Sequence, residues 1–318
     1  YAPNAAARSL ITNRTSTGGV VLPDIWGEDF SVVIRGIDVS ARQAGYHVLV
    51  SSSHSDLAEF REVLRTMYGR VDGLIVMSPD AAPGSLEGFL PPALPVVFLN
   101  SAPGGGRHAS LNVDNRGGAR AMVAHLLSIG HRRVVLVNGP STNSDAAERR
   151  RGFREALRAA GLRANDAAEI AGDFGEESGE AAGEAIARLT PRPTAVFVAN
   201  DSMAIGILLA LRRAGLRVPE DVAVAGFDDI PIARFSSPPL STVRNDLRNL
   251  GERALWRLLA ELSGEGPSPA AREVVPFRLV LRESTGGSGE EIPGGPPHEA
   301  SVPRQSSNRS LVRRRKAS

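Results

Sequence analysis

Carboxylate, amide and hydroxyl side chains recur in this sequence directly after short apolar runs. Each Asp or Asn can form hydrogen bonds with two adjacent hydroxyls of a ligand, and an aromatic ring can stack on the C–H face of a sugar. The pattern therefore suits a polyhydroxylated ligand. The same residue types also cap helix N-termini, and the two roles are compatible because both occur where a strand leads into a helix. The residues concerned are Asp24 with Trp26, Ser51–Ser53, Asn100, Asp114, Asn138, Asn200 with Asp201, and Asp228 with Asp229.

The sequence lacks the signatures of an enzyme. It contains no nucleophile elbow, phosphate-binding loop, H-E-x-x-H zinc motif or dinucleotide-binding glycine motif, and it has no cysteine. Asp228 and Asp229 are adjacent on an expected strand end, so their side chains point in different directions and do not share a proton. The histidines show no metal-ligand spacing. We therefore expect no catalytic residue, no metal site and no cofactor.

The apolar runs predict buried strands with helices between them. They are rich in Val, Leu and Ile and lack a two-residue alternation, as expected of strands buried on both faces. Between the runs, apolar residues recur at helical spacing, for example from Phe30 to Ala44, and Gly45 is expected to end that helix. This alternation predicts parallel sheets with helices on both faces, in which ligands bind beyond the carboxyl ends of the strands. The runs are 19–23, 46–51, 73–77, 95–99, 133–138, 194–199 and 222–227.

A length of 318 residues predicts two lobes, because a globular domain usually contains roughly 100–200 residues. The first lobe is expected to end near Gly130, and a helix over residues 246–262 is expected to return to it. The net charge of +2 comes from residues 285–318, which alone carry +3, so the folded body is not a nucleic-acid binder by itself. That tail is poor in apolar residues and is predicted to be disordered. The sequence predicts no membrane span, since no run approaches about 20 apolar residues.

Several motifs along the chain resemble those of a known family. They include GGVVLPD, GYHVLVSSS and VDGLIV, then GHRRVVLVNGP and VANDSMAIG, and finally VPEDVAVAGFDD. In this order, from about residue 1 to about residue 284, they resemble the LacI/GalR family of bacterial transcription repressors. The resemblance implies an α/β, periplasmic-binding-protein-like fold, with two doubly wound parallel-sheet subdomains joined by crossing strands. The expected parts are a hinge-helix segment (1–16), an N-terminal subdomain (17–129 plus 245–268), a C-terminal subdomain (130–244 plus 269–284) and a disordered basic tail (285–318).

The resemblance also implies a site and partners. A small effector, a sugar or a purine-like molecule, would bind between the subdomains of a cytoplasmic homodimer, and the full-length protein would bind operator DNA. Arg149 and Asp228 are expected to face each other across the cleft and hold the effector from opposite sides, so that Asp228→Ala would spare the fold. The expected effector contacts are Phe30, Asp114, Arg149, Phe174, Asn200 and Asp228, and the expected DNA-hinge residues are Asn4, Ala7, Arg8 and Leu10.

Three of these residues have a second interpretation. Phe30 begins an apolar helical stripe and would also suit the core. Arg149 stands among other arginines, as on a solvated helix face, and Phe174 would suit a loop anchor. Asp228 is the most specific of the set, because a carboxylate after a buried strand is costly without a partner.

The sequence departs from the family pattern at two places. Gly27–Glu28 replaces the Asn-Pro that usually follows the first strand, and Trp26 precedes it, so the resemblance does not imply the identity of the effector. Tyr1 falls where the helix-turn-helix of the family should end, so we expect this chain alone to have little sequence-specific DNA affinity. The alternative function is a stand-alone sugar-binding protein of a transport system, against which the lack of a signal-peptide pattern and the hinge-like segment both argue.

Overall fold

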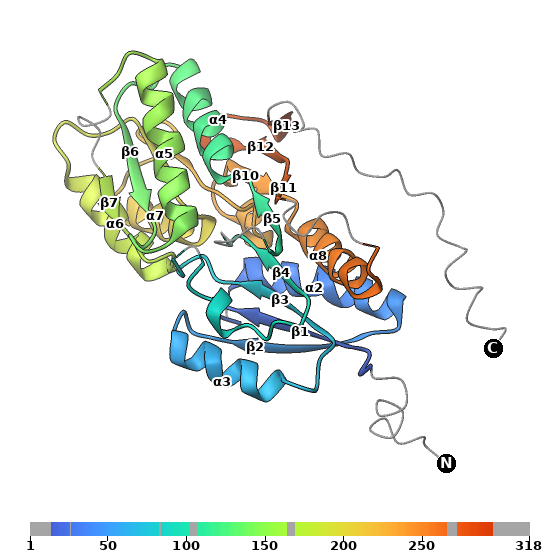
Figure 1. Cartoon of the computed structure of the whole chain (residues 1–318). Coiled ribbons are helices and arrows are strands. Elements are labelled where there is room, and N and C mark those ends of the chain that lie inside the picture. Colours follow the sequence, from blue (N-terminus) through green and yellow to red (C-terminus); the bar gives the residue numbers. More distant parts are fainter. Residues whose placement is uncertain are drawn as a thin grey trace.

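The structure is a computed structural model that describes residues 14–25, 27–82, 84–101, 107–163, 169–265 and 272–294. The chain forms two α/β lobes, each built around a parallel sheet (Figure 1). The predicted fold class is confirmed. The hinge residues Asn4, Ala7, Arg8 and Leu10, residue Trp26 and the tail beyond residue 294 lie outside the described part.

The N-terminal lobe contains a six-stranded sheet in the order β11-β5-β4-β3-β1-β2, in which all pairs are parallel. Successive strand residues are buried on opposite faces, because α2 and α8 cover one face and α3 covers the other. The elements are β1 (Thr17–Leu22), α2 (Glu28–Ala44), β2 (His47–Ser52), α3 (Leu57–Met67), β3 (Gly73–Met77), η1 (Glu87–Phe89), β4 (Val96–Leu99), β5 (Ala109–Val113), α8 (Leu247–Ser263) and β11 (Arg272–Val275).

The C-terminal lobe contains a parallel sheet in the order β7-β6-β8-β9 and a small antiparallel sheet in the order β10-β12-β13. Helices α4 and α5 cover one face of the parallel sheet, and α6 and α7 cover the other. The elements are α4 (Asn115–Ser128), β6 (Val134–Asn138), α5 (Ser144–Ala159), β7 (Glu169–Ala171), α6 (Glu176–Arg188), β8 (Ala195–Val198), α7 (Asp201–Arg213), β9 (Ala223–Ala225), η2 (Pro231–Phe235), β10 (Thr242–Asn245), β12 (Phe277–Leu281), η3 (Glu283–Thr285) and β13 (Glu290–Pro293).

Helix ends and close helix contacts follow from particular residues. Helix α2 ends at Gly45 in the left-handed conformation (φ 74°), as the sequence predicts. Glycines on facing helices let α2 and α8 approach closely, since a Cβ at Gly36 would meet the backbone of Arg248 and one at Gly251 would meet the backbone of Val33.

Within the described residues, the elements on either side show that the chain crosses between the lobes at three places. The first lies between β5 and α4, because α4 packs into the core of the second lobe with Phe153 and Phe197. The sequence interpretation places this crossing later, near residue 130. The error arises because the amphipathic pattern of α4 shows that it has an apolar face but not which sheet that face covers. The other crossings lie between β10 and α8 and between β11 and β12.

Residues 285–294 differ from the expected disordered tail. They contain the end of η3 and strand β13, which pairs with β12 through residues such as Ile292 opposite Leu279. All four side chains of β13 are exposed. The strand is therefore held by backbone hydrogen bonds to an open sheet edge. The apolar pattern of the side chains cannot predict such a strand.

Candidate effector-binding cleft

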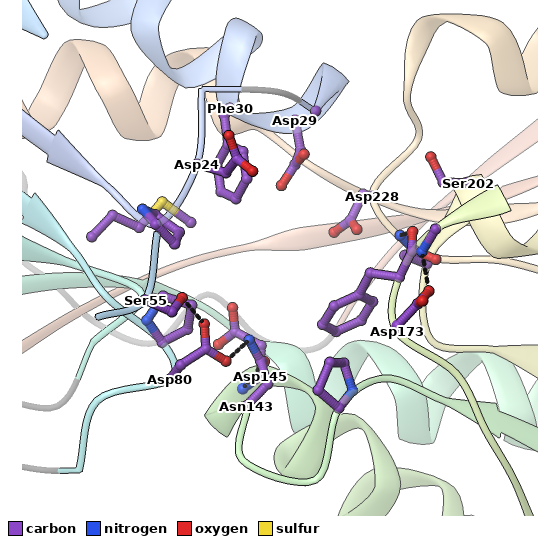
Figure 2. Close-up of a pocket in the computed structure, with 18 of the residues that line it drawn as sticks. Asp24, Asp29, Phe30, Ser55, Asp80, Asn143, Asp145, Asp173, Ser202 and Asp228 are labelled. Atoms are coloured by element: carbon purple, nitrogen blue, oxygen red, sulfur yellow. Dashed lines mark hydrogen bonds between the residues drawn. The ribbon is translucent and has the colours of Figure 1, made fainter. Parts of the chain in front are cut away.

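A cleft of about 900 Å³ separates the two lobes at the carboxyl ends of their parallel strands. Both lobes line it with polar and aromatic side chains, which Figure 2 shows around a common space. From the N-terminal lobe the lining includes Asp24, Asp29, Phe30, His54, Ser55 and Asp80, and from the C-terminal lobe Asn143, Asp145, Arg149, Asp173, Phe174, Glu176, Asn200, Asp201 and Asp228.

Arg149 is the most strongly held of these side chains. It lies on α5 and is 4% exposed. Its Nη1 and Nη2 donate to both carboxylate oxygens of Asp228, at 3.2 and 3.0 Å, and its Nε donates to Oδ1 of Asn115 at 2.8 Å. Nη1 also donates to the carbonyl of Ala199, and the guanidinium lies 3.9 Å from the centre of the Phe227 ring. Arg149 is therefore fixed before any ligand arrives, and it is not on a solvated helix face.

Asp228 follows β9 in a strained backbone conformation. Its φ is 101° and that of Asp229 is 53°, in the left-handed region that non-glycine residues rarely adopt. The amide of Asp228 donates to Val243 O of the crossing strand β10, which fixes the segment. Burial raises the pKa of Asp228 although Arg149 acts in the opposite direction. The expectation that Arg149 and Asp228 face each other across the cleft is wrong, because both belong to the C-terminal lobe and contact each other directly.

The N-terminal lobe presents Asp29 and Phe30 from the first turn of α2. Asp29 from this lobe and Asp228 from the other lobe both point into the cavity (Figure 2). Burial, followed by repulsion from Asp228, raises the pKa of Asp29 to about 6. Phe30 lies at the edge of the core cluster of its lobe and also lines the cleft, so both interpretations of this residue hold.

Asp145 occupies the first turn of α5, at the base of the cleft. It accepts a hydrogen bond from Nδ2 of Asn115 at 2.8 Å, and the same Asn115 holds Arg149. Burial is the largest cause that raises the pKa of Asp145; Arg149 lowers it and the charges of Asp228 and Asp29 raise it, and together these effects bring it to about 7.

Two hydrogen bonds join the lobes along one side of the cleft. Nδ2 of Asn143 donates to Asp80 at 3.0 Å, and the amide of Ser144 donates to the carbonyl of Pro79 at 2.9 Å. Asp80 also accepts from the hydroxyl of Ser55 at 2.7 Å (Figure 2). Asn143 at the same time caps α5 through the amides of the first turn. These contacts couple the N-terminus of α5 to the end of β3.

Phe174 and Asn200 are linked to each other. Asn200 caps α7 by accepting from Met203 N at 3.1 Å, while its Nδ2 donates to the carbonyl of Phe174 at 2.9 Å. Phe174 has a φ of 74°, and its ring covers Gly139 so closely that a Cβ there would overlap it. Ring and amide thus have fixed positions at the edge of the second lobe.

Five of the six expected effector contacts line the cleft, and Asp114 does not. Asp114 caps α4 by accepting from Gly117 N at 2.8 Å, which is the alternative role that the residue type allowed. The sequence interpretation missed Asp29, Asp80, Asn143 and Asp145. The last two stand at the start of a helix that follows a strand, whereas the sequence pattern points to Asn138, the last residue of that strand.

The part of the chain that the structure describes contains no cluster of three His, Cys, Asp or Glu residues arranged to hold a metal ion. Within the same residues, no helix combines the length and the apolar character needed to cross a bilayer.

Comparison with known proteins places the chain in a family. Residues 123–285 match the model of the periplasmic binding protein-like domain. The ribose operon repressor of Escherichia coli (strain K12) is 35% identical over 265 residues, which cover 83% of this chain and 80% of that repressor. The transcriptional repressor PurR of Photobacterium profundum is 34% identical over 286 residues, covering 89% and 85% of the two chains.

Solved structures give the same result. The lac repressor dimer bound to operator and an anti-inducer has a TM-score of 0.82 and 29% identity, covering 90% of this chain and 100% of that one. The complex of the transcriptional regulator CelR with cellobiose has a TM-score of 0.77 and 28% identity, covering 89% and 91%. All four relatives are transcription regulators by name. The chain therefore belongs to the LacI/GalR family of transcription regulators, of which it forms the periplasmic-binding-protein-like core.

Proposed function

We propose that the cleft binds a small polyhydroxylated or purine-like effector and that this binding controls operator binding by a homodimeric repressor in the cytoplasm. The chain acts by binding and conformational change, not as an enzyme. Because the lobes are joined by crossing segments, closure on a ligand changes the position of the N-terminal ends of a dimer, and the affinities for ligand and operator are coupled reciprocally.

The observation that carries this proposal is the composition of the two walls of the cleft. Each wall supplies one aromatic ring, Phe30 or Phe174, beside fixed hydrogen-bonding groups. Rings flanked by carboxylates and amides bind molecules with an apolar face and hydroxyl or N–H edges. The names of the relatives agree with this chemistry, since one regulates a ribose operon and another is complexed with cellobiose.

Exposed apolar side chains support the dimer. Leu57 is the first residue of α3 and Tyr68 follows its last residue, while Ile232 and Phe235 lie on η2. Tyr68 is 70% and Phe235 68% exposed. Exposed apolar groups of this kind are typical of interaction sites. The main apolar face of α8 packs within its own lobe, whereas Trp256 of the same helix is 45% exposed. We assign the α3 and η2 groups to a contact with a second copy, and the similar lac repressor is a dimer by name.

A thermal-shift screen over sugars, nucleosides and purines tests the proposal, because a ligand that binds the native state raises its stability. Hits are then titrated into the full-length repressor on operator DNA. We expect a hit that changes operator affinity and loses its effect in Asp228→Asn. Ligands that stabilise the protein without any change in operator affinity would contradict the proposal, and a monomer in sedimentation at tens of micromolar would contradict the dimer.

A further inference from the structure

The charges that line the cleft are strongly unbalanced. Eight carboxylates are among the described lining residues, whereas the cationic side chains are Arg149 and the titratable His54. His54 forms its own pair with Glu59 at 2.5 Å, on the exposed rim. The carboxylates are Asp24, Asp29, Asp80, Asp145, Asp173, Glu176, Asp201 and Asp228.

Arg149 does not balance this charge for a ligand. A guanidinium has five N–H donors, and those of Arg149 are directed at Asn115, Ala199 and both oxygens of Asp228, which leaves one hydrogen on Nη2. The Phe227 ring covers one face of the group. Arg149 thus serves to hold Asp228, and it is not an open receptor for a phosphate or carboxylate.

Some of the carboxylates are satisfied within the protein. Asp201 accepts from the Thr242 hydroxyl at 2.7 Å and from Ile230 N at 3.0 Å, and Asp80 accepts from Ser55 and Asn143. These two groups have structural partners and do not require a ligand.

Asp29 and Asp145 differ from these two carboxylates in their partners and surroundings. The ion pairs among the described residues include none to either group. The hydrogen bonds of Asp29 come from backbone amides at the start of α2, and Asp145 accepts from the neutral amide of Asn115. Asp29 belongs to one lobe and Asp145 to the other, and each repels Asp228 and the other. Burial and this repulsion together raise their pKa values to about 6 and about 7. Hydroxyls of a neutral ligand can donate to these carboxylates but bring no positive charge to offset their mutual repulsion, and an anionic ligand would add to that repulsion.

We propose that the effector is a polyhydroxylated molecule with a basic nitrogen, which binds as a cation among Asp29, Asp145 and Asp228. The inference rests on the proposed function and makes it more specific. The hydroxyls contact Asn200, the C–H face packs on the rings, and the ammonium bridges the carboxylates of the two lobes. A phosphate or carboxylate at this position is excluded.

Matched sugars test the inference at neutral pH. Glucosamine and galactosamine are compared with glucose, galactose and their N-acetylated forms, and with glucuronate and glucose 6-phosphate, by thermal shift and then calorimetry. We expect at least one amine to bind about tenfold more tightly than its neutral and N-acetylated counterparts, and the anions not to bind. Asp29→Asn should remove most of this advantage, while Asp38→Asn, a change of equal charge on the exposed side of α2, should leave it intact.

The remaining outcomes contradict the inference in distinguishable ways. If neutral sugars bind as tightly as the amines and lose binding in Asp228→Asn, the ammonium is wrong and the effector function stands. If an anionic sugar binds more tightly than the amines, the proposed ammonium is likewise wrong and the effector function stands. If no amine binds, the inference is overturned, and the effector function is then decided by the broader screen described above.

Discussion

Both carboxylate oxygens of Asp228 are bound by the guanidinium of Arg149, at 3.0 and 3.2 Å, with the side chains 12% and 5% exposed. The pair lies within one lobe and is complete before a ligand binds. Asp228 therefore offers a ligand its remaining acceptor capacity from a fixed position, and Arg149 acts on the ligand through Asp228.

Breaking this pair should destabilise the fold. Arg149→Met leaves Asp228 buried without its cation, a change that typically costs about 3–5 kcal/mol, and urea unfolding measures it. The double variant Arg149→Met/Asp228→Leu should recover part of the loss, because no buried charge remains. Contrary to the expectation from the sequence, Asp228→Ala should also lower the free energy of unfolding, because it leaves Arg149 buried without its anion. An unfolding curve for Arg149→Met that matches wild type would contradict this account.

The free energy of unfolding should depend on pH through the titration of Asp145. A carboxyl group with a raised native pKa binds more protons in the native state than in the unfolded state. The free energy of unfolding therefore falls as pH rises from about 3.8 to about 7, by about 1.4 kcal/mol for each unit of pKa difference.

Asp145→Asn removes this titration and keeps an oxygen that can accept from Asn115. The ligand-free variant should lose less stability than wild type between mildly acidic and neutral pH. Urea midpoints at several pH values check this, with the exposed Asp38→Asn as the control. Equal slopes in Asp145→Asn and wild type would show that Asp145 does not titrate in this range.

The inter-lobe contact of Asn143 can be separated from its capping role. Serine caps helices about as well as asparagine but is too short to keep the bond to Asp80. Asn143→Ser should therefore unfold like wild type, yet exchange the amide hydrogen of Ser144 faster, because that amide donates to Pro79 of the other lobe.

Asn143→Ala, in comparison, should also lose about 0.5–2 kcal/mol of stability with the cap. Hydrogen exchange by mass spectrometry over residues 140–146 makes the measurement. Unchanged exchange in both variants would mean that the bond to Asp80 does not hold the lobes together.

The close contact of α2 and α8 makes a further prediction. A Cβ at Gly251 would meet the carbonyl of Val33, so Gly251→Ala must separate the two helices. Overpacking of this kind costs about 1–3 kcal/mol. At Gly88 there is no atom within 4 Å of an added Cβ, so Gly88→Ala should leave the melting temperature almost unchanged. Similar melting temperatures for the two variants would contradict the packing argument.

The sequence predicted the strands that are apolar on both faces, such as β3 and β8, because every one of their residues is buried and their composition is therefore apolar throughout. It missed β13, which depends on an open sheet edge. It also placed Asp228 and Arg149 at the cleft, which they line, but misplaced them relative to each other, since the lobe on which a side chain lies depends on where the chain crosses. Asp29 and Asp145 were missed for a related reason, because their burial arises from two lobes meeting.

The three crossings between the lobes also determine the order in which the protein is completed during synthesis. The first five strands of the N-terminal sheet leave the ribosome early, but Leu250, Leu255 and Leu258 of α8, which cover one face of that sheet, come after residue 246. Its edge strand β11 follows later still. Nascent chains usually fold their N-terminal domain first. Here the lobe that is made first has this face covered only in part, by α2, until almost the whole chain has emerged.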